Sequence, residues 1–352
     1  MRLRWGICSC GNISSDFVSA LSMLPQDEHA VTAIATGNSE VRARKFAMKF
    51  SMKHVKTYGS YEQLINCSDV DIIYVGATNK LHFPICMAAL QAGKHVLCET
   101  PLGLNAWQVR KMIDCARENG KFLMEGYWTR CFPAYKEIQE QITGGGIGEV
   151  KFLIADFGFR DDASTQYIWE RKEGGGILMA IGCYLVNVAQ LIFGGERPVK
   201  ISAHGFLHKE TEIDDSAAIT LVYEDNRIAQ LLYSATAFSE CRAQIIGTNG
   251  RLVIPATFWC PTVLERQAAE LIPSEKNEQF SFEVPQKEGV EFAYPNGSGL
   301  TYEAHCVREC IMNGLTECPK MSLDESLLLA EILGEIRKQL GVSYEADADT
   351  AV

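Results

Sequence analysis

Short apolar runs alternate with helical patterns through the first 126 residues of the chain. The predicted strands span residues 3–8, 31–35, 71–76, 95–98 and 122–125, and the predicted helices span residues 13–24, 39–50, 81–92 and 106–119. Strands without a polar face are typical of a parallel sheet that helices cover on both sides. The pattern therefore predicts an α/β, doubly wound Rossmann domain over residues 1–126.

The pattern changes in residues 127–343, where longer β-rich runs follow one another. The predicted strands span residues 149–158, 199–207, 217–223, 227–235 and 242–246, with helices at residues 177–193, 302–312 and 324–340. The turn signals at residues 224–226 and 248–250 favour hairpins. We expect an α+β domain with an open, mainly antiparallel sheet for substrate binding and dimerisation, followed by a flexible tail at residues 344–352.

Charge and hydropathy narrow the class of ligand. The 352-residue chain has a formal charge of −11 and no basic cluster, which argues against nucleic acid or an anionic membrane as partner. No apolar run approaches the roughly 18 residues of a membrane span, and the start resembles a strand rather than a signal peptide. We expect a cytoplasmic protein with a small-molecule substrate.

The thirteen cysteines do not have the regular spacing of a disulfide framework, so reduced thiols are expected. Cys306 and Cys310 lie one helical turn apart beside His305. Structural zinc usually takes four ligands from paired motifs, and buried cysteine behaves as a small hydrophobe. No metal site is predicted.

The turn after the first strand has the position of a dinucleotide-binding fingerprint, G-x-G-x-x-G. Only its central glycine, Gly11, is present, with small Ser9 and Ser14 at the outer positions. Gly11 allows the backbone to approach a pyrophosphate, and the first-turn amides at Asn12 and Ile13 stabilise its charge. An ordinary strand-to-helix turn is the alternative, which the following β-α series disfavours.

The end of the second strand bears on the choice of coenzyme. Thr36, Gly37 and Asn38 include no carboxylate, whereas NAD sites usually place one there for the ribose hydroxyls. The absence favours NADP, with NAD still possible. Arg42 or Arg44 in the next helix would neutralise a 2′-phosphate, although surface arginines are often only solvated.

Two further motifs follow the next strands, and they carry a family resemblance. Thr78, Asn79 and His82 lie in one, and the triplet Glu99-Thr100-Pro101 lies in the other. The sequence resembles the glucose-fructose oxidoreductase and inositol dehydrogenase (Gfo/Idh/MocA) family, which has a Glu-Lys-Pro triplet, often with a cis proline, and a Thr-Asn-His stretch near the nicotinamide. Other stretches resemble its dihydrodiol-oxidising branch, and the likeness runs from residue 3 to about residue 343. These stretches are residues 3–7, 13–17, 58–62, 128–130, 259–262 and 302–304.

The resemblance implies hydride transfer between a nicotinamide and a hydroxyl carbon of a trans-dihydrodiol or an aldose such as D-xylose. Tyr184 matches the tyrosine that acts as proton donor in this branch. Three positions differ from the family: Thr100 replaces the lysine, Ala180 the aspartate and Gly37 the arginine. Loss of such groups typically costs about 10² to 10⁴ in rate. A slow dehydrogenase and a paralogue that binds dinucleotide without turnover therefore both stay open.

Other positions have secondary roles in this interpretation. His82 is expected to orient near the nicotinamide or to be simply exposed, and Glu99 to contact the ribose or carboxamide. The pair Asp214-Asp215 is interpreted as a solvated turn. Candidate substrate-side residues are Trp128, Arg130, Asp156, Arg160 and Trp169. A homodimer would bury an apolar face of the sheet, for which we expect Leu221, Ala229, Leu231 and Tyr233.

Overall fold

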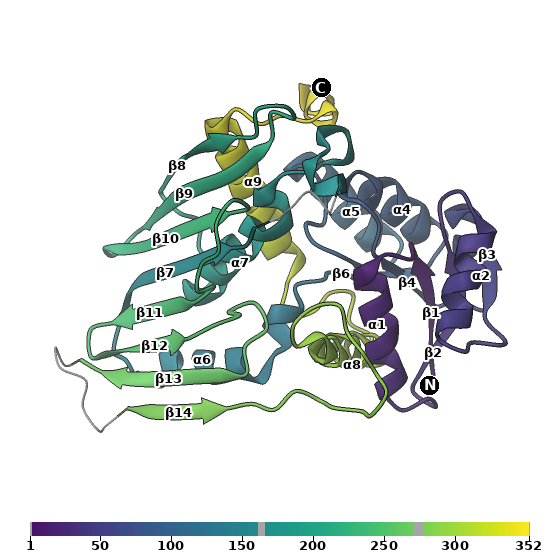
Figure 1. Cartoon of the computed structure of the whole chain (residues 1–352), viewed down its shortest axis with the longest axis horizontal. Helices are drawn as coiled ribbons and strands as arrows, with labels where there is room; N and C mark the ends of the chain where they lie inside the picture. Colours follow the sequence, from purple (N-terminus) through teal and green to yellow (C-terminus); the bar gives the residue numbers. More distant parts are fainter. Residues whose placement is uncertain (1, 161–165, 270–276, 352) are drawn as a thin grey trace. The chain divides into compact units, whose positions relative to one another are not determined.

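The computed structural model describes residues 2–160, 166–269 and 277–351, which form two compact units (Figure 1). The first unit comprises Met1–Gly103, Trp107–Trp128 and Val284–Ser326, and the second comprises Leu104–Ala106, Thr129–Glu283 and Leu327–Val352. The predicted boundary at residue 126 falls close to one of these divisions. The return of residues 284–326 to the first unit was not predicted.

A six-stranded parallel sheet in the order β3-β2-β1-β4-β5-β6 forms the centre of the first unit. The strands are β1 Leu3–Cys8, β2 His29–Ala35, β3 Lys56–Tyr58, β4 Ile72–Val75, β5 His95–Cys98 and β6 Leu123–Glu125. The chain order reverses between β1 and β4, so the loops after these strands border the position where doubly wound sheets bind ligands. The predicted Rossmann architecture is confirmed.

The helices of this unit are α1 Asn12–Met23, α2 Glu40–Lys49, α3 Tyr61–Ile65, α4 Asn79–Gln91, α5 Ala106–Glu118 and α8 Leu300–Met312. Helix α8 packs against α1 although almost 280 residues separate them along the chain. Beside this contact, the buried Asp16 carboxylate on α1 accepts hydrogen bonds from the Ala293 and Tyr294 amides at 2.8 and 2.9 Å. A polar residue inside an amphipathic helix gives no signal of such a distant partner.

An eight-stranded sheet in the order β14-β13-β12-β11-β7-β10-β9-β8 forms the second unit. Only the β7–β10 pair is parallel among its described neighbours, which confirms a mainly antiparallel sheet. The strands are β7 Val150–Gly158, β8 Lys200–Leu207, β9 Asp214–Tyr223, β10 Arg227–Ser234, β11 Ala243–Gly247, β12 Gly250–Ile254, β13 Val263–Ala268 and β14 Glu278–Ser281. The helices are α6 Pro133–Thr143, α7 Cys183–Ile192 and α9 Leu323–Leu340.

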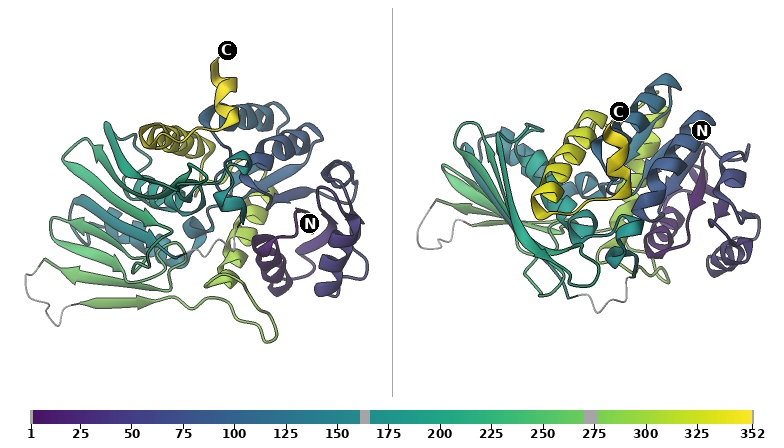
Figure 2. Two further views of the ribbon diagram at one scale, coloured as in Figure 1. Left: turned by 45° about the horizontal axis from the view of Figure 1, so that its top comes forward. Right: turned by 90° about the horizontal axis from the view of Figure 1, so that it is seen from above.

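The two faces of this sheet differ in what covers them. Helix α7 packs against β7 and β10, and Figure 2 shows the helices of this unit gathered over one face. Leu221, Ala229, Leu231 and Tyr233 are at most 2% exposed on this covered face, so assigning them to a free face was wrong. Strand side chains alternate between faces, and the apolar residues of the open face are Phe152, Ile154, Phe206 and Leu232, which are 43 to 76% exposed.

The start of the predicted tail has contacts in the second unit. The buried Tyr344 hydroxyl donates to the Gly175 carbonyl at 2.5 Å, and Asp347 pairs with buried Arg337 at 2.8 Å. One described helical stretch, Arg171–Ile192, is long and apolar enough to span a membrane, contrary to the sequence expectation. In the structure 83% of its most apolar window is buried, as in the core helix of a globular unit.

Candidate functional site

The turn between β1 and α1 leaves room for a ligand at Gly11. Ser9 adopts φ = 84°, a left-handed conformation that favours glycine, at the first glycine position of the fingerprint. Gly11 is the N-cap of α1, where no side chain caps the amides. A Cβ atom built on Gly11 would approach only the Ser9 hydroxyl, at 4.0 Å. The fold itself does not require glycine here, whereas a pyrophosphate against the first-turn amides of exposed Asn12 and half-buried Ile13 would.

The turn between β2 and α2 separates the two candidate arginines. Arg44 pairs with Glu40 at 2.7 Å one turn away. Arg42 has no ion-pair partner among the described residues, and its exposed guanidinium lowers the pKa of Cys10 and Tyr61 although burial raises both. The charge of Arg42 therefore acts on Cys10 in the β1–α1 turn.

The other residues of this turn have defined positions. Thr36 is buried. Its hydroxyl accepts a hydrogen bond from the Ser39 amide at 3.0 Å and donates one to the Ser39 carbonyl at 2.7 Å. Gly37 and Asn38 are exposed. A Cβ atom at Gly37 would lie 3.2 Å from the Tyr61 ring, which accounts for a small residue here.

His82 connects the loops after β4 and β5 and is not exposed. Its ring nitrogens lie 2.8 Å from the Pro101 carbonyl and 3.0 Å from the Ala77 carbonyl. Burial lowers its pKa, whereas the two carbonyls raise it. A neutral ring has a single N–H and donates to one of these carbonyls, and only the protonated ring donates to both. Half-buried Thr78 and Asn79 begin α4 in the same loop region.

The triplet after β5 adopts a defined conformation. The Thr100–Pro101 bond is cis, as the family resemblance implies. The Leu102 amide donates to the buried Glu125 carboxylate at 2.8 Å, which fixes the loop behind Pro101. Thr100 is half-buried at the carboxyl end of the parallel sheet.

Buried carboxylates lie beneath this loop. The Tyr74 hydroxyl donates to Glu99 Oε1 at 2.5 Å, and burial raises the pKa of Glu99 to about 7. Glu303 on α8 is fully buried, and neither of its oxygens has a hydrogen-bond partner in the described chain. Burial and the Glu99 charge raise the pKa of Glu303 well above its usual range. The burial of Glu303 was not predicted from the sequence, because a glutamate in a helix is normally solvated.

Glu303→Gln is expected to flatten the pH dependence of stability. Burial raises the pKa of both carboxyl groups, so the stability that they contribute falls as pH rises above about 4.5. For Glu99 this loss ends near its folded pKa of about 7. For Glu99 alone the difference amounts to about 3 kcal/mol. Urea unfolding of the wild type at pH 5 and pH 8 should therefore show a loss that Glu303→Gln reduces.

Glu309→Gln on the same helix is the matched control, because the Glu309 side chain is 60% exposed. The control should keep the wild-type pH dependence. Equal slopes for the wild type and Glu303→Gln would show that folding does not raise the pKa of Glu303.

The glycine run in the second unit begins the segment that carries Tyr184. Gly174 and Gly176 have φ values of 74° and 133°, and a Cβ atom on Gly175 would lie 2.3 Å from the Ile168 carbonyl. A π-helical turn, Leu178–Gly182, follows and continues into α7. Such turns are often found at functional sites.

Asp214 holds the start of this π-helical turn. Its fully buried carboxylate accepts from the Leu178 amide at 2.5 Å and from the Tyr233 hydroxyl at 2.8 Å. The interpretation of Asp214 as part of a solvated turn was wrong. Strict alternation along β9 would turn Asp214 away from the covered face that holds Ala217 and Leu221. The sheet register shifts where Asp214 pairs with Leu207, and the carboxylate lies close to Gly176 of the glycine run.

Tyr184 is half-buried in an otherwise buried part of α7. Ala180, one turn earlier, is also half-buried, so the two positions share an accessible face of the helical segment. The Tyr184 ring lies edge-on to Phe157 with a centroid separation of 6.5 Å. Part of Tyr184 therefore stays accessible while Phe157 packs beside its ring.

The candidate substrate residues fall into two groups. Trp128 is buried in the first unit, and the other four belong to the second unit. Arg130 Nε donates to Asn187 at 3.2 Å, Asp156 accepts from the Cys241 amide at 2.8 Å, Trp169 packs on His208, and exposed Arg160 bridges to Thr236. Arg130 and Asp156 thus have structural contacts in addition to any ligand role.

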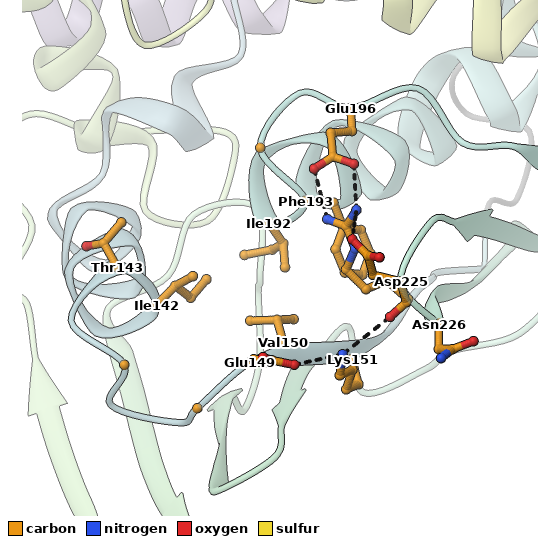
Figure 3. Close-up of a pocket in the computed structure, with 14 residues that line it drawn as sticks. Ile142, Thr143, Glu149, Val150, Lys151, Ile192, Phe193, Glu196, Asp225 and Asn226 are labelled. Atoms are coloured by element: carbon orange, nitrogen blue, oxygen red, sulfur yellow. Dashed lines mark hydrogen bonds and ion pairs between the residues drawn. The ribbon is translucent and has the colours of Figure 1, made fainter.

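A cavity of about 880 Å³ lies elsewhere in the second unit, between the ends of α6 and α7 and the start of β7 (Figure 3). Its cations are neutralised, since Arg227 pairs with Glu196 at 2.5 Å and Lys151 with Glu149 at 2.9 Å. None of the candidate site residues lines it. The charged side chains that line this cavity thus form ion pairs with one another.

Comparisons with known proteins define the class. Residues 3–127 match the family described as "Oxidoreductase family, NAD-binding Rossmann fold", and residues 135–253 match the "GFO/IDH/MocA C-terminal domain". The chain belongs to the Gfo/Idh/MocA family of NAD(P)-binding oxidoreductases. This membership agrees with the Rossmann sheet and with the cis triplet after β5.

Individual relatives and solved structures are similar to this chain over nearly its whole length. The chain is 42% identical to trans-1,2-dihydrobenzene-1,2-diol dehydrogenase of Xenopus tropicalis over 98% of its own length and 100% of the relative. The crystal structure of KijD10, a 3-ketoreductase from Actinomadura kijaniata in complex with NADP and TDP-benzene, matches with a TM-score of 0.79 at 25% identity, covering 96% of this chain and 98% of that one. Levoglucosan dehydrogenase in complex with NADH and levoglucosan has a similar fold, with a TM-score of 0.83 at 18% identity over 97% of this chain and 98% of that one.

Proposed function

We propose that the chain is an NADP-dependent dehydrogenase that oxidises a hydroxyl carbon of a trans-dihydrodiol or of an aldose such as D-xylose. The observation that carries the proposal is the uncapped α1 terminus at Gly11, where a side chain would meet only open space. The name of the Xenopus tropicalis relative supports a diol substrate. The charge balance of the chain argues against a nucleic-acid or anionic-membrane partner. The free cysteines support a cytoplasmic location.

The residues on the first unit fit a dinucleotide. The α1 amides would hold the pyrophosphate, and Arg42 would hold the 2′-phosphate. Glu99 and the loops joined by His82 would border the nicotinamide, at the carboxyl ends of β4 and β5. When bound, the nicotinamide supplies the hydride acceptor.

In this proposal Tyr184 acts as the general acid and base. The tyrosinate form of Tyr184 would receive the proton of the substrate hydroxyl during oxidation, and the resulting Tyr184 hydroxyl would donate a proton during reduction. Thr100 donates a hydrogen bond to the substrate oxygen but carries no charge to stabilise an alkoxide. Trp128 and Trp169 would supply apolar walls, and Arg130, Asp156 and Arg160 would supply polar contacts to hydroxyl groups.

Arg42→Gln is expected to weaken NADPH binding by about tenfold to a hundredfold and to leave NADH binding unchanged, because only NADPH carries the 2′-phosphate. Fluorescence titration with both coenzymes measures the two dissociation constants. Arg44→Gln is the matched control, since Arg44 is already paired with Glu40. Parallel losses for both coenzymes would contradict the assignment of Arg42.

A paralogue that binds dinucleotide without turnover is the second candidate function, and the absence of a lysine at Thr100 favours it. Steady-state assays of NADP reduction with D-xylose and with trans-1,2-dihydrobenzene-1,2-diol separate the two candidates. Reduction of NADP supports the dehydrogenase. Coenzyme binding without reduction by either substrate supports the paralogue.

Homodimerisation through the open face of the eight-stranded sheet is also part of the proposal. Phe152, Ile154 and Leu232 are exposed on adjoining strands of this face, where a twin sheet would cover them. Sedimentation should give a dimer at micromolar concentration. A monomer at that concentration would contradict it.

A further inference from the structure

Three thiols converge in the first unit, away from the β1–α1 turn. Cys306 and Cys310 lie one turn apart on α8, and Cys318 comes from the segment that follows the helix. Their sulfur atoms all lie within 4.8 Å of one another, and the Cys306 and Cys318 sulfurs are 3.5 Å apart. The three side chains are 9%, 6% and 0% exposed. Sequence spacing alone shows only the helical pair.

The spacing of the sulfurs fits a trigonal metal site. Metal–thiolate bonds of about 2.3 Å directed to the corners of a triangle separate the sulfurs by about 4 Å. A disulfide would instead need two of them at about 2.05 Å. The Cys306–Cys318 separation of 3.5 Å and the upper limit of 4.8 Å for all three pairs bracket this value of about 4 Å.

The ligand set selects the kind of ion. Among the described residues no histidine or carboxylate joins the three sulfurs, and neighbouring His305 is half-exposed and faces Glu309 at 3.3 Å. Structural zinc almost always takes four ligands. Soft thiolates without a fourth ligand suit Cu(I).

Binding must displace protons from the thiols. Hydrogen bonding with Cys306 raises the pKa of Cys318 to about 11, and contacts with both neighbours raise the pKa of Cys310. The Lys320 amide donates to Cys318 and favours its thiolate. An ion that binds thiolate strongly is needed to release these protons, and its affinity should rise with pH.

We propose that Cys306, Cys310 and Cys318 form a three-coordinate thiolate site for one Cu(I) ion. The ion would join α8 to the segment after it, which pairs with β6 through the Leu123 amide and the Thr316 carbonyl at 3.1 Å. Each bound thiolate loses one proton to solvent, and no oxidation or reduction takes place.

Competition for Cu(I) against bicinchoninate tests the site on the full, reduced chain under anaerobic conditions. We expect one tightly bound Cu(I) per chain, and at least a hundredfold weaker binding by Cys310→Ser and by Cys318→Ser. Cys86→Ser is the matched control, because Cys86 is a buried thiol of the same unit that contacts Cys98 outside the three-sulfur cluster. The control should bind as the wild type does.

A second measurement needs no variant. Alkylation under partial denaturation, followed by peptide mass spectrometry, should show Cu(I) protecting residues 306, 310 and 318 at least tenfold and Cys115 not at all. Equal competition by the wild type and Cys310→Ser, or equal alkylation with and without Cu(I), would overturn the proposal.

Discussion

The Thr100→Lys variant is expected to reduce NADP about 10²- to 10⁴-fold faster than the wild type with a diol or aldose substrate. Thr100 lies at the end of β5, in the cis triplet of a Gfo/Idh/MocA chain, where the family has lysine. A lysine there places a positive charge beside the oxygen on which negative charge develops. Thr100 offers only a hydroxyl dipole.

Thr100→Met is the matched control, because methionine approaches the length of lysine without its charge. It should not exceed the wild-type rate in initial-rate assays at saturating NADP. Thr100→Lys could bind NADPH as the wild type does and still show no NADP reduction. In that case Ala180 or the substrate pocket limits the reaction, and the result counts against the proposed dehydrogenase.

Tyr184→Phe is expected to lower kcat by about 10²- to 10⁴-fold and to leave coenzyme affinity unchanged. The phenylalanine ring keeps the edge-on contact with Phe157, so the fold should tolerate the change. If wild-type turnover is too slow to measure, the Thr100→Lys background supplies the signal. Single-turnover rates of NADPH formation measure the loss.

Tyr223→Phe is the control for a tyrosine of the same unit. Tyr223 packs on Phe193 with a centroid separation of 4.5 Å and is 2% exposed. It should keep the parent rate. A Tyr184→Phe rate within about twofold of the parent would exclude Tyr184 as the proton-transfer group, since a lost acid or base costs far more.

Local patterns sufficed for the elements of the Rossmann sheet. Strands such as Leu3–Cys8 and His95–Cys98 were predicted with their observed bounds, because buried parallel strands leave continuous apolar runs. Short elements such as β3 and α3 were missed, since three to five residues carry too little periodicity. The order of the strands in the sheet was not predicted and comes from the structure.

Long-range contacts account for what the sequence could not predict. Glu303 and Asp214 resembled solvated carboxylates, yet each is fully buried by elements distant along the chain. Tyr344 looked like part of a loose tail, yet its hydroxyl binds the glycine run. Such polar contacts depend on which elements meet, and neither periodicity nor composition encodes that meeting.

The candidate site was predictable only where it rests on local motifs. The motif at Gly11 is local, and its position after β1 follows from the strand pattern. The choice between Arg42 and Arg44 required the structure, because it shows that Arg44 pairs with Glu40. The open face of the eight-stranded sheet could be identified only from the structure, which shows where α7 packs.

Calorimetric titration with NADPH tests most directly whether the α1 terminus at Gly11 holds a dinucleotide. The wild type should release heat and bind one coenzyme per chain, with a higher melting temperature in its presence. Gly11→Val should bind at least a hundredfold more weakly while its own melting temperature falls by no more than about 4 °C, because its side chain enters open space. A wild type that shows neither heat nor a shift in melting temperature with NADPH or NADH would contradict the account.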